Sequence, residues 1–398
     1  MKVLFVVPPL TGHVNPTVSV GTELTRRGHD VAWCGYPDRI AHLLPERARL
    51  LPVADETPPH LVAAVTEEGR GKRGVSALKF LWEAVLLPLN RAMADGVRAT
   101  IRSYEPDVVV ADQQAFIGGI VAGTERIPWA TSATTSAELT DPLADTPKID
   151  AWVREALVEI QVEQGVPAER AAEHDPRFSP HLVVAFTTEA LTGPLDSLTA
   201  PCAFIGPAIS DRVDATPFPW DWLVPDRPLV LVSLGTLNAM DGERFFAAAA
   251  DAVGDLPVQA VLIADPAMVP DPSANVLVAE RVPQLALLER TSAVVTHAGH
   301  NTTCEALAHG IPLVVAPIRD DQPIVAHQVV TAGAGVRVKF GRINADVLRA
   351  AIVRALDDED LRAGAARIQK SFAEAGGPAE AADRLEALAG VAPQEVPS

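Results

Sequence analysis

The sequence predicts an α/β protein with two Rossmann-like domains, each built on a doubly wound parallel sheet. Three observations support this prediction. The chain has 398 residues, more than one hydrophobic core usually organises. Short apolar runs alternate with helical patterns, as expected for parallel strands that are covered on both faces. The alternation stops at a proline-rich segment and then starts again.

The first half of the chain contains five apolar runs that we expect to be buried strands. We expect the first helix to place Pro16 at its first helical position and to end at Gly28. The first run is too short to span a bilayer, so we interpret it as a strand and not as a signal peptide. The expected strands are Val3–Val7, Val31–Cys34, Val108–Ala111, Ala130–Ala133 and Leu182–Phe186.

A linker and a second domain follow. The segment Ile205–Pro228 contains five prolines and few periodic apolar positions, which is typical of a linker. The expected strands beyond it are Leu229–Val232, Val261–Ala264, Val276–Val278, Val294–Thr296 and Leu313–Ala316. Helical patterns cover residues 242–254, 301–309, 322–332, 344–356 and 359–390. We therefore expect an N-terminal domain over 1–207, a linker over 208–228, a second domain over 229–375, and a C-terminal helix over 376–398 that returns to the first domain.

Charge and cysteine content exclude several classes of partner. The formal net charge of −18 repels phosphate backbones and anionic lipid head groups, so we expect neither nucleic-acid nor membrane binding. The three cysteines are widely spaced and form no CxxC pattern, which favours a reducing cytoplasm over a disulfide scaffold. The sequence does not decide the oligomeric state, and a homodimer is compatible with it.

Polar residues that could carry chemistry stand at the ends of expected strands, where parallel sheets bind ligands. They are His13, Asp112, Thr236 and His297. The densest segment is Thr296–Glu305, in which Gly299 permits close backbone approach and Asn301, Thr302 or Thr303 can cap the next helix. Backbone N–H groups and the helix dipole then converge on one point that suits a diphosphate. A capped helix without a ligand is the alternative interpretation.

The motifs resemble a known family. Val282-Pro-Gln284, His297-Ala-Gly-His-Asn-Thr-Thr-Cys-Glu305, Gly310-Ile-Pro312 and Pro317-Ile-Arg-Asp-Asp321-Gln322 follow one another in this order. This order and spacing resemble the donor-binding signature of the family 1 glycosyltransferases, which include plant secondary-product and bacterial antibiotic and macrolide enzymes. Pro8-x-x-x-Gly12-His13-x-x-Pro16 and Val232-Ser-Leu-Gly235-Thr236 extend the resemblance over nearly the whole chain. It implies the GT-B fold, with the acceptor in the first domain, the donor in the second and the reaction in a cleft between them.

The resemblance also implies a role for each matching residue on the donor side. Contacts to the donor diphosphate are implied for Thr236, His297, Gly299, Asn301 and Thr302. Nucleoside contacts are implied for Arg281, the Val282 backbone, Gln284 and Glu305, of which Gln284 and Glu305 would hold the ribose. Asp321 and Gln322 would bind hydroxyls of the transferred sugar. Arg281 stands where many members carry a base-stacking Trp, so UDP and dTDP both remain open as the nucleotide.

His13 matches the family's catalytic base, and Asp112 matches the carboxylate that orients it. A neutral imidazole is suited to remove a hydroxyl proton near pH 7, and an aspartate can stabilise the imidazolium that forms. A single displacement opposite the diphosphate would invert the anomeric centre. The simpler alternatives are a loop histidine satisfied by backbone and a strand-end carboxylate that caps a helix.

No metal and no cofactor beyond the nucleotide-sugar co-substrate are expected. Asp358-Glu359-Asp360 matches an Asp-x-Asp metal motif, but we interpret it as a solvated helix start. The acceptor is expected to be a small hydrophobic or aromatic natural product. Leu78–Met93, an apolar helical stretch with a break at Pro88, is a candidate for lining its pocket, and core packing is the alternative.

Three other functions fit the fold class less well. A UDP-sugar 2-epimerase shares the architecture but would not need His13 paired with Asp112. A nicotinamide dehydrogenase would need a G-x-G-x-x-G turn after the first strand, where this chain has Pro8-Pro9-Leu10-Thr11-Gly12. A non-catalytic partner protein would not be expected to keep His13, Asp112 and the donor-site residues together.

Overall fold

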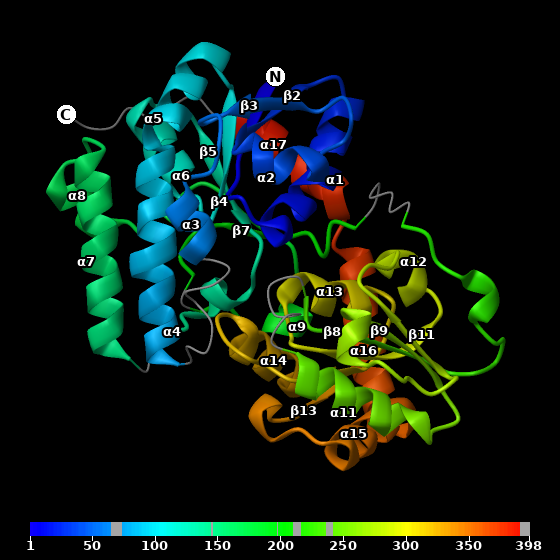
Figure 1. The fold of residues 1–398 in the computed structure, drawn as a ribbon. Helices are drawn as coiled ribbons and strands as arrows, with labels where there is room; N and C mark the ends of the chain where they lie inside the picture. The colour runs from blue at the N-terminus through cyan, green and yellow to red at the C-terminus, as the bar shows by residue number, and fades with distance from the viewer. Residues whose placement is uncertain (65–73, 145, 197, 210–215, 236–241, 391–398) are drawn as a thin grey trace. The chain divides into compact units, whose positions relative to one another are not determined.

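The computed structural model describes residues 1–64, 74–144, 146–196, 198–209, 216–235 and 242–390. The chain divides into two compact units (Figure 1). Unit 1 comprises Met1–Phe186, Leu195–Arg212 and Ala375–Ser398, and unit 2 comprises Thr187–Pro194 and Val213–Glu374. Thr187–Pro194, which lies within the expected N-terminal domain, therefore belongs to unit 2, where Leu191 joins the hydrophobic core.

Among the described residues, unit 1 contains a sheet of seven parallel strands in the order β3-β2-β1-β4-β5-β6-β7. Val6 of the central strand β1 pairs with Cys34 of β2 on one side and with Ala111 of β4 on the other. The strands are β1 Lys2–Val6, β2 Asp30–Gly35, β3 Arg49–Pro52, β4 Val108–Asp112, β5 Trp129–Ala133, β6 Val183–Ala185 and β7 Cys202–Phe204. All five strands expected in this half are present, and β3 and β7 are additional.

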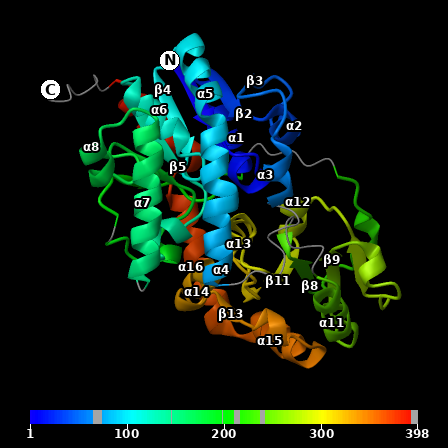
Figure 2. The same cartoon turned by 60° about the vertical axis from the view of Figure 1, so that its left-hand side comes forward.

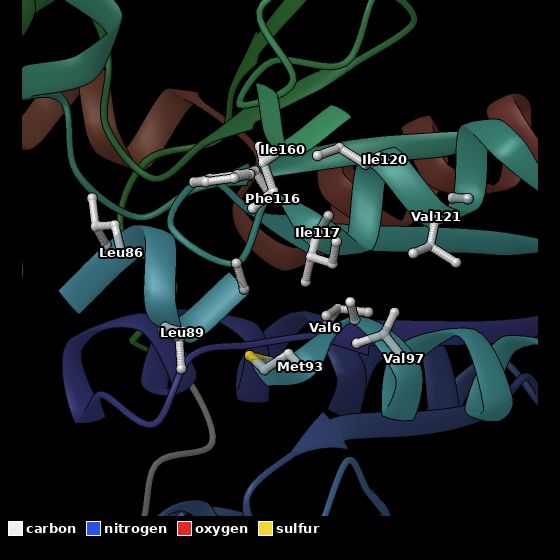
Figure 3. Close-up of a cluster of buried hydrophobic side chains, with 14 of the residues drawn as sticks. Val6, Leu86, Leu89, Met93, Val97, Phe116, Ile117, Ile120, Val121 and Ile160 are labelled. Atoms are coloured by element: carbon white, nitrogen blue, oxygen red, sulfur yellow. The ribbon is translucent and has the colours of Figure 1, made fainter. Parts of the chain in front are cut away.

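Helices cover both faces of this sheet because its strands are apolar on both faces. Alternate residues of β1 point to opposite faces, so Val6 belongs to the core cluster that includes residues of α5, α6 and α7, while Phe5 belongs to the cluster that includes residues of α1 and α17. Figure 3 shows Val6 facing Met93 and Val97 of α5 and Ile117 of α6. In Figures 1 and 2, α5 and α7 run side by side. The α-helices are α1 Thr11–Arg26, α2 Pro37–Ile40, α3 Pro59–Ala63, α4 Val75–Phe80, α5 Leu87–Tyr104, α6 Ile117–Thr124, α7 Pro147–Glu163, α8 Ala168–Glu173 and α17 Gly377–Ala389.

Two expectations for helices of unit 1 were wrong. Helix α1 begins at Thr11 and contains Pro16 in its interior, so its first turn lies directly after β1 and includes His13. The expected break at Pro88 is absent. The six-residue π-helix η3 (Leu81–Leu86) instead joins α4 to α5 directly before Pro88, and Leu86 and Leu87 keep helical backbone angles, so the helical segment continues past the proline.

Among its described residues, unit 2 contains a sheet of six parallel strands in the order β10-β9-β8-β11-β12-β13. Helices α11 and α15 pack on one face, and α13, α14 and α16 pack on the other. The strands are β8 Leu229–Ser233, β9 Gln259–Ile263, β10 Val276–Ala279, β11 Thr291–Thr296, β12 Leu313–Val315 and β13 Gly335–Arg337. The α-helices are α9 Glu189–Thr192, α11 Glu243–Gly254, α12 Gln284–Leu288, α13 His300–Ala308, α14 Gln322–Thr331, α15 Ala345–Asp357 and α16 Glu359–Glu374. Of these elements, β13 and the short helices α9 and α12 were not expected from the sequence.

The long helical pattern over 359–390 forms two helices that belong to different units. Gly376 adopts a φ of 82°, in the left-handed region that favours glycine, and separates α16 in unit 2 from α17 in unit 1. Helix α17 packs on α1, where Arg27 donates to Asp383 at 2.6 Å. None of the described helices has the length and hydropathy needed to cross a membrane.

Candidate functional site

The two sheets place the candidate residues at equivalent points of their topology. In each sheet the strand order reverses beside the first strand, between β1 and β4 in unit 1 and between β8 and β11 in unit 2. Open parallel sheets bind ligands outside the carboxyl ends of the strands at such a reversal. His13 and Asp112 follow β1 and end β4, whereas Gly235 and His297 follow β8 and β11. Each pair therefore lies at the ligand-binding position of its own unit.

In unit 1, the structure brings His13 and Asp112 together. The imidazole Nδ1 lies 2.9 Å from Oδ1 and 3.0 Å from Oδ2 of the carboxylate. The His13 side chain is 14% exposed and the Asp112 side chain is fully buried. Adjacent pairing of β1 and β4 explains the contact, because the loop after one strand meets the end of the other. A buried carboxylate beside Nδ1 can orient the ring and stabilise its protonated form.

Thr134 is a third member of this group, and the sequence analysis did not select it. Its hydroxyl donates to Oδ2 of Asp112 at 2.8 Å and lies 2.7 Å from Nδ1 of His13. The backbone N–H of Gln114 donates to Oδ1 of Asp112 at 2.8 Å. Thr134 directly follows β5, which pairs with β4, so its place at the end of the expected strand Ala130–Ala133 was the signal that could have identified it.

In unit 2, the imidazole of His297 is confined by glycines. A Cβ atom added to Gly235 would lie 2.6 Å from Cε1 of the ring, and one added to Gly299 would lie 2.4 Å from Nε2. His297 is 8% exposed, and burial lowers its pKa from an ordinary 6.5 to about 4. The ring is therefore neutral at physiological pH and can serve as a hydrogen-bond donor without carrying charge.

Helix α13 begins one residue earlier than expected and has no side-chain cap. Gly299 is the N-cap residue, so the prediction that Asn301, Thr302 or Thr303 caps the helix was wrong. Asn301 and Thr302 instead lie in the first turn, which places their backbone N–H groups at the positive end of the helix. Ala298 has a φ of 67°, a left-handed conformation that costs a non-glycine residue about 1 kcal/mol.

The residues implied for the nucleoside lie on two neighbouring elements. Nε2 of Gln284, at the start of α12, donates to Oε2 of Glu305 on α13 at 2.6 Å. Glu305 is 3% exposed and Val282 is 6% exposed, whereas Arg281 is exposed. The structure thus brings Gln284 and Glu305 together. Thr236 lies outside the described residues.

The residues implied for the transferred sugar lie at the start of α14. Asp321 is its N-cap residue, and Gln322 is the first helical residue. Oε1 of Gln322 accepts from the backbone N–H groups of Ile318 at 2.9 Å and Arg319 at 3.1 Å. A donor role toward a sugar hydroxyl therefore falls to the Nε2 group of Gln322.

The run Asp358-Glu359-Asp360, which matches an Asp-x-Asp metal motif in sequence, contributes to the start of helix α16. Oδ1 of Asp358 accepts from the backbone N–H groups of Asp360 and Leu361 at the start of α16. Within the described part of the chain, no group of three or more His, Cys, Asp or Glu side chains could hold a metal ion.

Comparison with known proteins identifies the family. The model of the C-terminal domain of erythromycin biosynthesis protein CIII-like proteins matches residues 248–388. The chain is 31% identical to 4'-demethylrebeccamycin synthase of Lentzea aerocolonigenes, over 97% of this chain and 99% of that protein. It is also 31% identical to demethyllactenocin mycarosyltransferase of Streptomyces fradiae, over 97% of this chain and 86% of that protein. The chain belongs to the family 1 antibiotic glycosyltransferases.

Solved structures agree with this assignment. The calicheamicin glycosyltransferase CalG4 superimposes on this antibiotic glycosyltransferase with a TM-score of 0.79 and 24% identity, covering 100% of this chain and 99% of CalG4. The glycosyltransferase SnogD from Streptomyces nogalater gives a TM-score of 0.75 and 26% identity, covering 98% and 99% of the two chains. The predictions of the GT-B fold and of glycosyltransferase activity are therefore confirmed.

Proposed function

We propose that this antibiotic glycosyltransferase moves a sugar from a UDP- or dTDP-sugar to a hydroxyl of a small hydrophobic natural product, with inversion and without a metal. The observation that carries the proposal is the contact of the His13 imidazole with the buried carboxylate of Asp112. A histidine paired in this way can take a proton from a hydroxyl nucleophile near neutral pH.

The proposed reaction is one displacement. Nε2 of His13 removes the proton of the acceptor hydroxyl while the acceptor oxygen forms a bond to the anomeric carbon. The bond between that carbon and the diphosphate oxygen breaks on the opposite face, and the electron pair leaves with the diphosphate. Asp112 stabilises the imidazolium that results.

The donor side supports the same proposal. His297 and the amino end of α13 would donate to the diphosphate, where negative charge develops as it leaves. The Gln284–Glu305 pair would hold the ribose. Asp321 and Gln322 would bind the sugar, and Thr236 would approach the diphosphate. Demethyllactenocin mycarosyltransferase and CalG4 are both named as transferases, which does not favour the epimerase alternative.

The proposal is tested with a two-step experiment. UDP-glucose and dTDP-glucose are first incubated with the protein and a panel of phenolic and polyketide alcohols, and the anomeric configuration of any product is determined by NMR. His13→Ala is then compared with wild type on the best acceptor. We expect about 10²- to 10⁴-fold slower transfer, because the base is lost, with unchanged nucleotide affinity.

Two results would overturn the proposal. Transfer at the wild-type rate by His13→Ala, with the chemical step limiting, would remove His13 from the base role. Conversion of the nucleotide sugar to an epimer in the absence of any acceptor would favour the 2-epimerase instead.

A further inference from the structure

The hydroxyl of Thr134 lies between the side chains of His13 and Asp112, the two residues of the proposed catalytic pair. It lies 2.7 Å from Nδ1 of His13 and 2.8 Å from Oδ2 of Asp112, so it contacts both groups at once. Thr134 is 3% exposed and follows the end of β5, an element separate from those that carry His13 and Asp112. The contact is therefore built by the sheet and does not arise from neighbouring residues in the chain.

A threonine hydroxyl has one proton to donate, which fixes the direction of these bonds. The hydroxyl donates that proton to Oδ2 of Asp112, so only its lone pairs remain for Nδ1 of His13. Nδ1 then has three oxygen atoms within 3.0 Å, namely two carboxylate oxygens and the hydroxyl oxygen. All three accept hydrogen bonds, so the arrangement is satisfied only when Nδ1 carries a proton.

We propose that Thr134 is a positioning residue that, together with Asp112, holds His13 in the tautomer with the proton on Nδ1. This inference rests on the proposed function, in which His13 is the base. With the proton on Nδ1, the lone pair of the neutral ring is on Nε2, which is the state that a base requires. The opposite tautomer would place a proton on Nε2 and could not accept one from the acceptor.

The same hydroxyl also stabilises the carboxylate. Asp112 is fully buried, and its charge is supported by hydrogen bonds from His13, from Thr134 and from the backbone N–H of Gln114. A buried carboxylate requires such donors to stay charged. Removing the Thr134 hydroxyl removes one donor to Asp112 and one acceptor for Nδ1 together, so it weakens the orientation of the ring from both sides.

The test compares Thr134→Val, which keeps the shape of the side chain but lacks the hydroxyl, with Thr134→Ser, which keeps the hydroxyl. We expect Thr134→Val to lower kcat about 10- to 100-fold, in line with the loss of a hydrogen bond to a charged group. The KM for the donor and the affinity for UDP or dTDP should not change. Thr134→Ser should restore most of kcat.

A matched control comes from α1, the helix that carries His13. Thr17 is fully buried, donates to the backbone oxygen of Val14 at 2.7 Å and accepts from Nε1 of Trp33 at 2.9 Å. Thr17→Val therefore removes a buried hydroxyl whose two hydrogen-bond partners are neither His13 nor Asp112. It should lower the melting temperature and leave kcat unchanged.

The ¹⁵N NMR spectrum of the His13 ring reports its tautomer directly, and a purely structural role of Thr134 would leave this spectrum unchanged. The His13 signals are assigned as those that disappear in His13→Ala. Wild type and Thr17→Val should both show a protonated Nδ1, and Thr134→Val should show a shifted or mixed tautomer. This measurement needs no turnover, so it stands apart from the test of the base itself. Unchanged His13 signals in Thr134→Val would overturn the inference. A raised donor KM with unchanged kcat would also overturn it, and would indicate a sugar contact.

Discussion

Gly235 and Gly299 lie against the ring of His297, and replacing Gly235 by alanine is predicted to weaken nucleotide binding. A control variant can separate the steric effect of the added methyl group on the ring from the strain of a left-handed backbone. A Cβ atom at Gly235 would lie 2.6 Å from Cε1 and 2.9 Å from Nε2 of the ring, whereas ordinary contact begins at 3.4 Å. In Gly235→Ala the ring must therefore move by about 0.8 Å or more, or the Gly235 loop must move instead. If Nε2 donates to the donor diphosphate, either movement lengthens that hydrogen bond.

The magnitude follows from the strength of such a bond. A hydrogen bond to a charged group contributes about 1.5–3 kcal/mol, and it weakens steeply once its length departs from about 2.8 Å. Since 1.4 kcal/mol corresponds to about a tenfold change in affinity, Gly235→Ala should raise the Kd for UDP or dTDP about 10- to 100-fold.

Gly333 supplies the matched control. Its φ of 68° is nearly the same as the 69° of Gly235, and it belongs to the same unit, but nothing lies within 4 Å of an added Cβ. Both alanine variants should therefore lose about 1–2 kcal/mol of stability to the left-handed backbone, and only Gly235→Ala should lose affinity. Gly299→Ala provides a second check, because it crowds the same ring at 2.4 Å without a positive φ.

Isothermal titration calorimetry with UDP and with dTDP, accompanied by thermal melts, measures these quantities. An unchanged Kd in Gly235→Ala would refute the reasoning, because the ring would then be unimportant or free to relax. Equal losses of affinity in Gly235→Ala and Gly333→Ala would also refute it, since backbone strain alone would account for the effect.

Two further predictions concern pH and metal. Because the pKa of His297 is about 4 when folded and about 6.5 when exposed, the unfolded chain binds an extra proton between these values, and stability falls as the pH drops from 6.5 to 4. Between pH 7 and pH 4.5, wild type should lose about 2 kcal/mol more than His297→Gln in urea denaturation; an identical pH dependence of the two would contradict the assignment. Transfer should persist at full rate after dialysis against EDTA, and activity that vanishes and returns with Mg²⁺ would show that a metal takes part.

The strands that sequence analysis identified and those that it missed differ in one physical property. The identified strands form the interior of each sheet, with the exception of β10, and are apolar runs because helices cover both of their faces. The missed strands β3, β7 and β13 all lie at sheet edges, where residues such as Arg49 and Arg337 are exposed. Edge strands are short and need no continuous apolar run, so hydrophobic patterning does not reveal them.

Helix starts were harder to predict than helix existence. Proline is common at the first helical position, and this preference placed the start of α1 near Pro16. However, the buried stripe of α1 already includes Val14 and continues through Val18 and Gly21, which is a helical spacing that begins before the proline. The same weighting of local signals led to the expected cap at Asn301, Thr302 or Thr303, although Gly299 takes that position. In α1 the buried stripe, and not the preference of proline, sets the first turn, whereas in α13 glycine takes the N-cap position that a polar side chain was expected to fill.

The candidate site residues were selected from strand ends and from the family resemblance, and neither signal identified the residues that support them. Asp112 could be paired with His13 through the family resemblance, and the structure places them in contact. The contacts of Gly235 and Gly299 with His297 depend on the left-handed turn after β8 and on the cap of α13. The contact of Gly235 joins residues 62 positions apart and leaves no periodic trace in the sequence, whereas Gly299 lies only two residues from His297 and depends on the local turn.

The two units use the same topology to place two imidazoles in different surroundings. Gly12-His13 and Gly299-His300 are the same two residues in sequence, but their loops are not equivalent, because the first follows β1 and the second follows β11, the counterpart of β4. In unit 1 the imidazole follows the first strand and a carboxylate ends the fourth. In unit 2 the imidazole follows the fourth strand and a glycine follows the first. A carboxylate stabilises an imidazolium, whereas a glycine permits close contact but supplies no charge. In the proposed mechanism, this pair of strand ends therefore suits His13 to accepting a proton and His297 to remaining neutral beside the departing diphosphate.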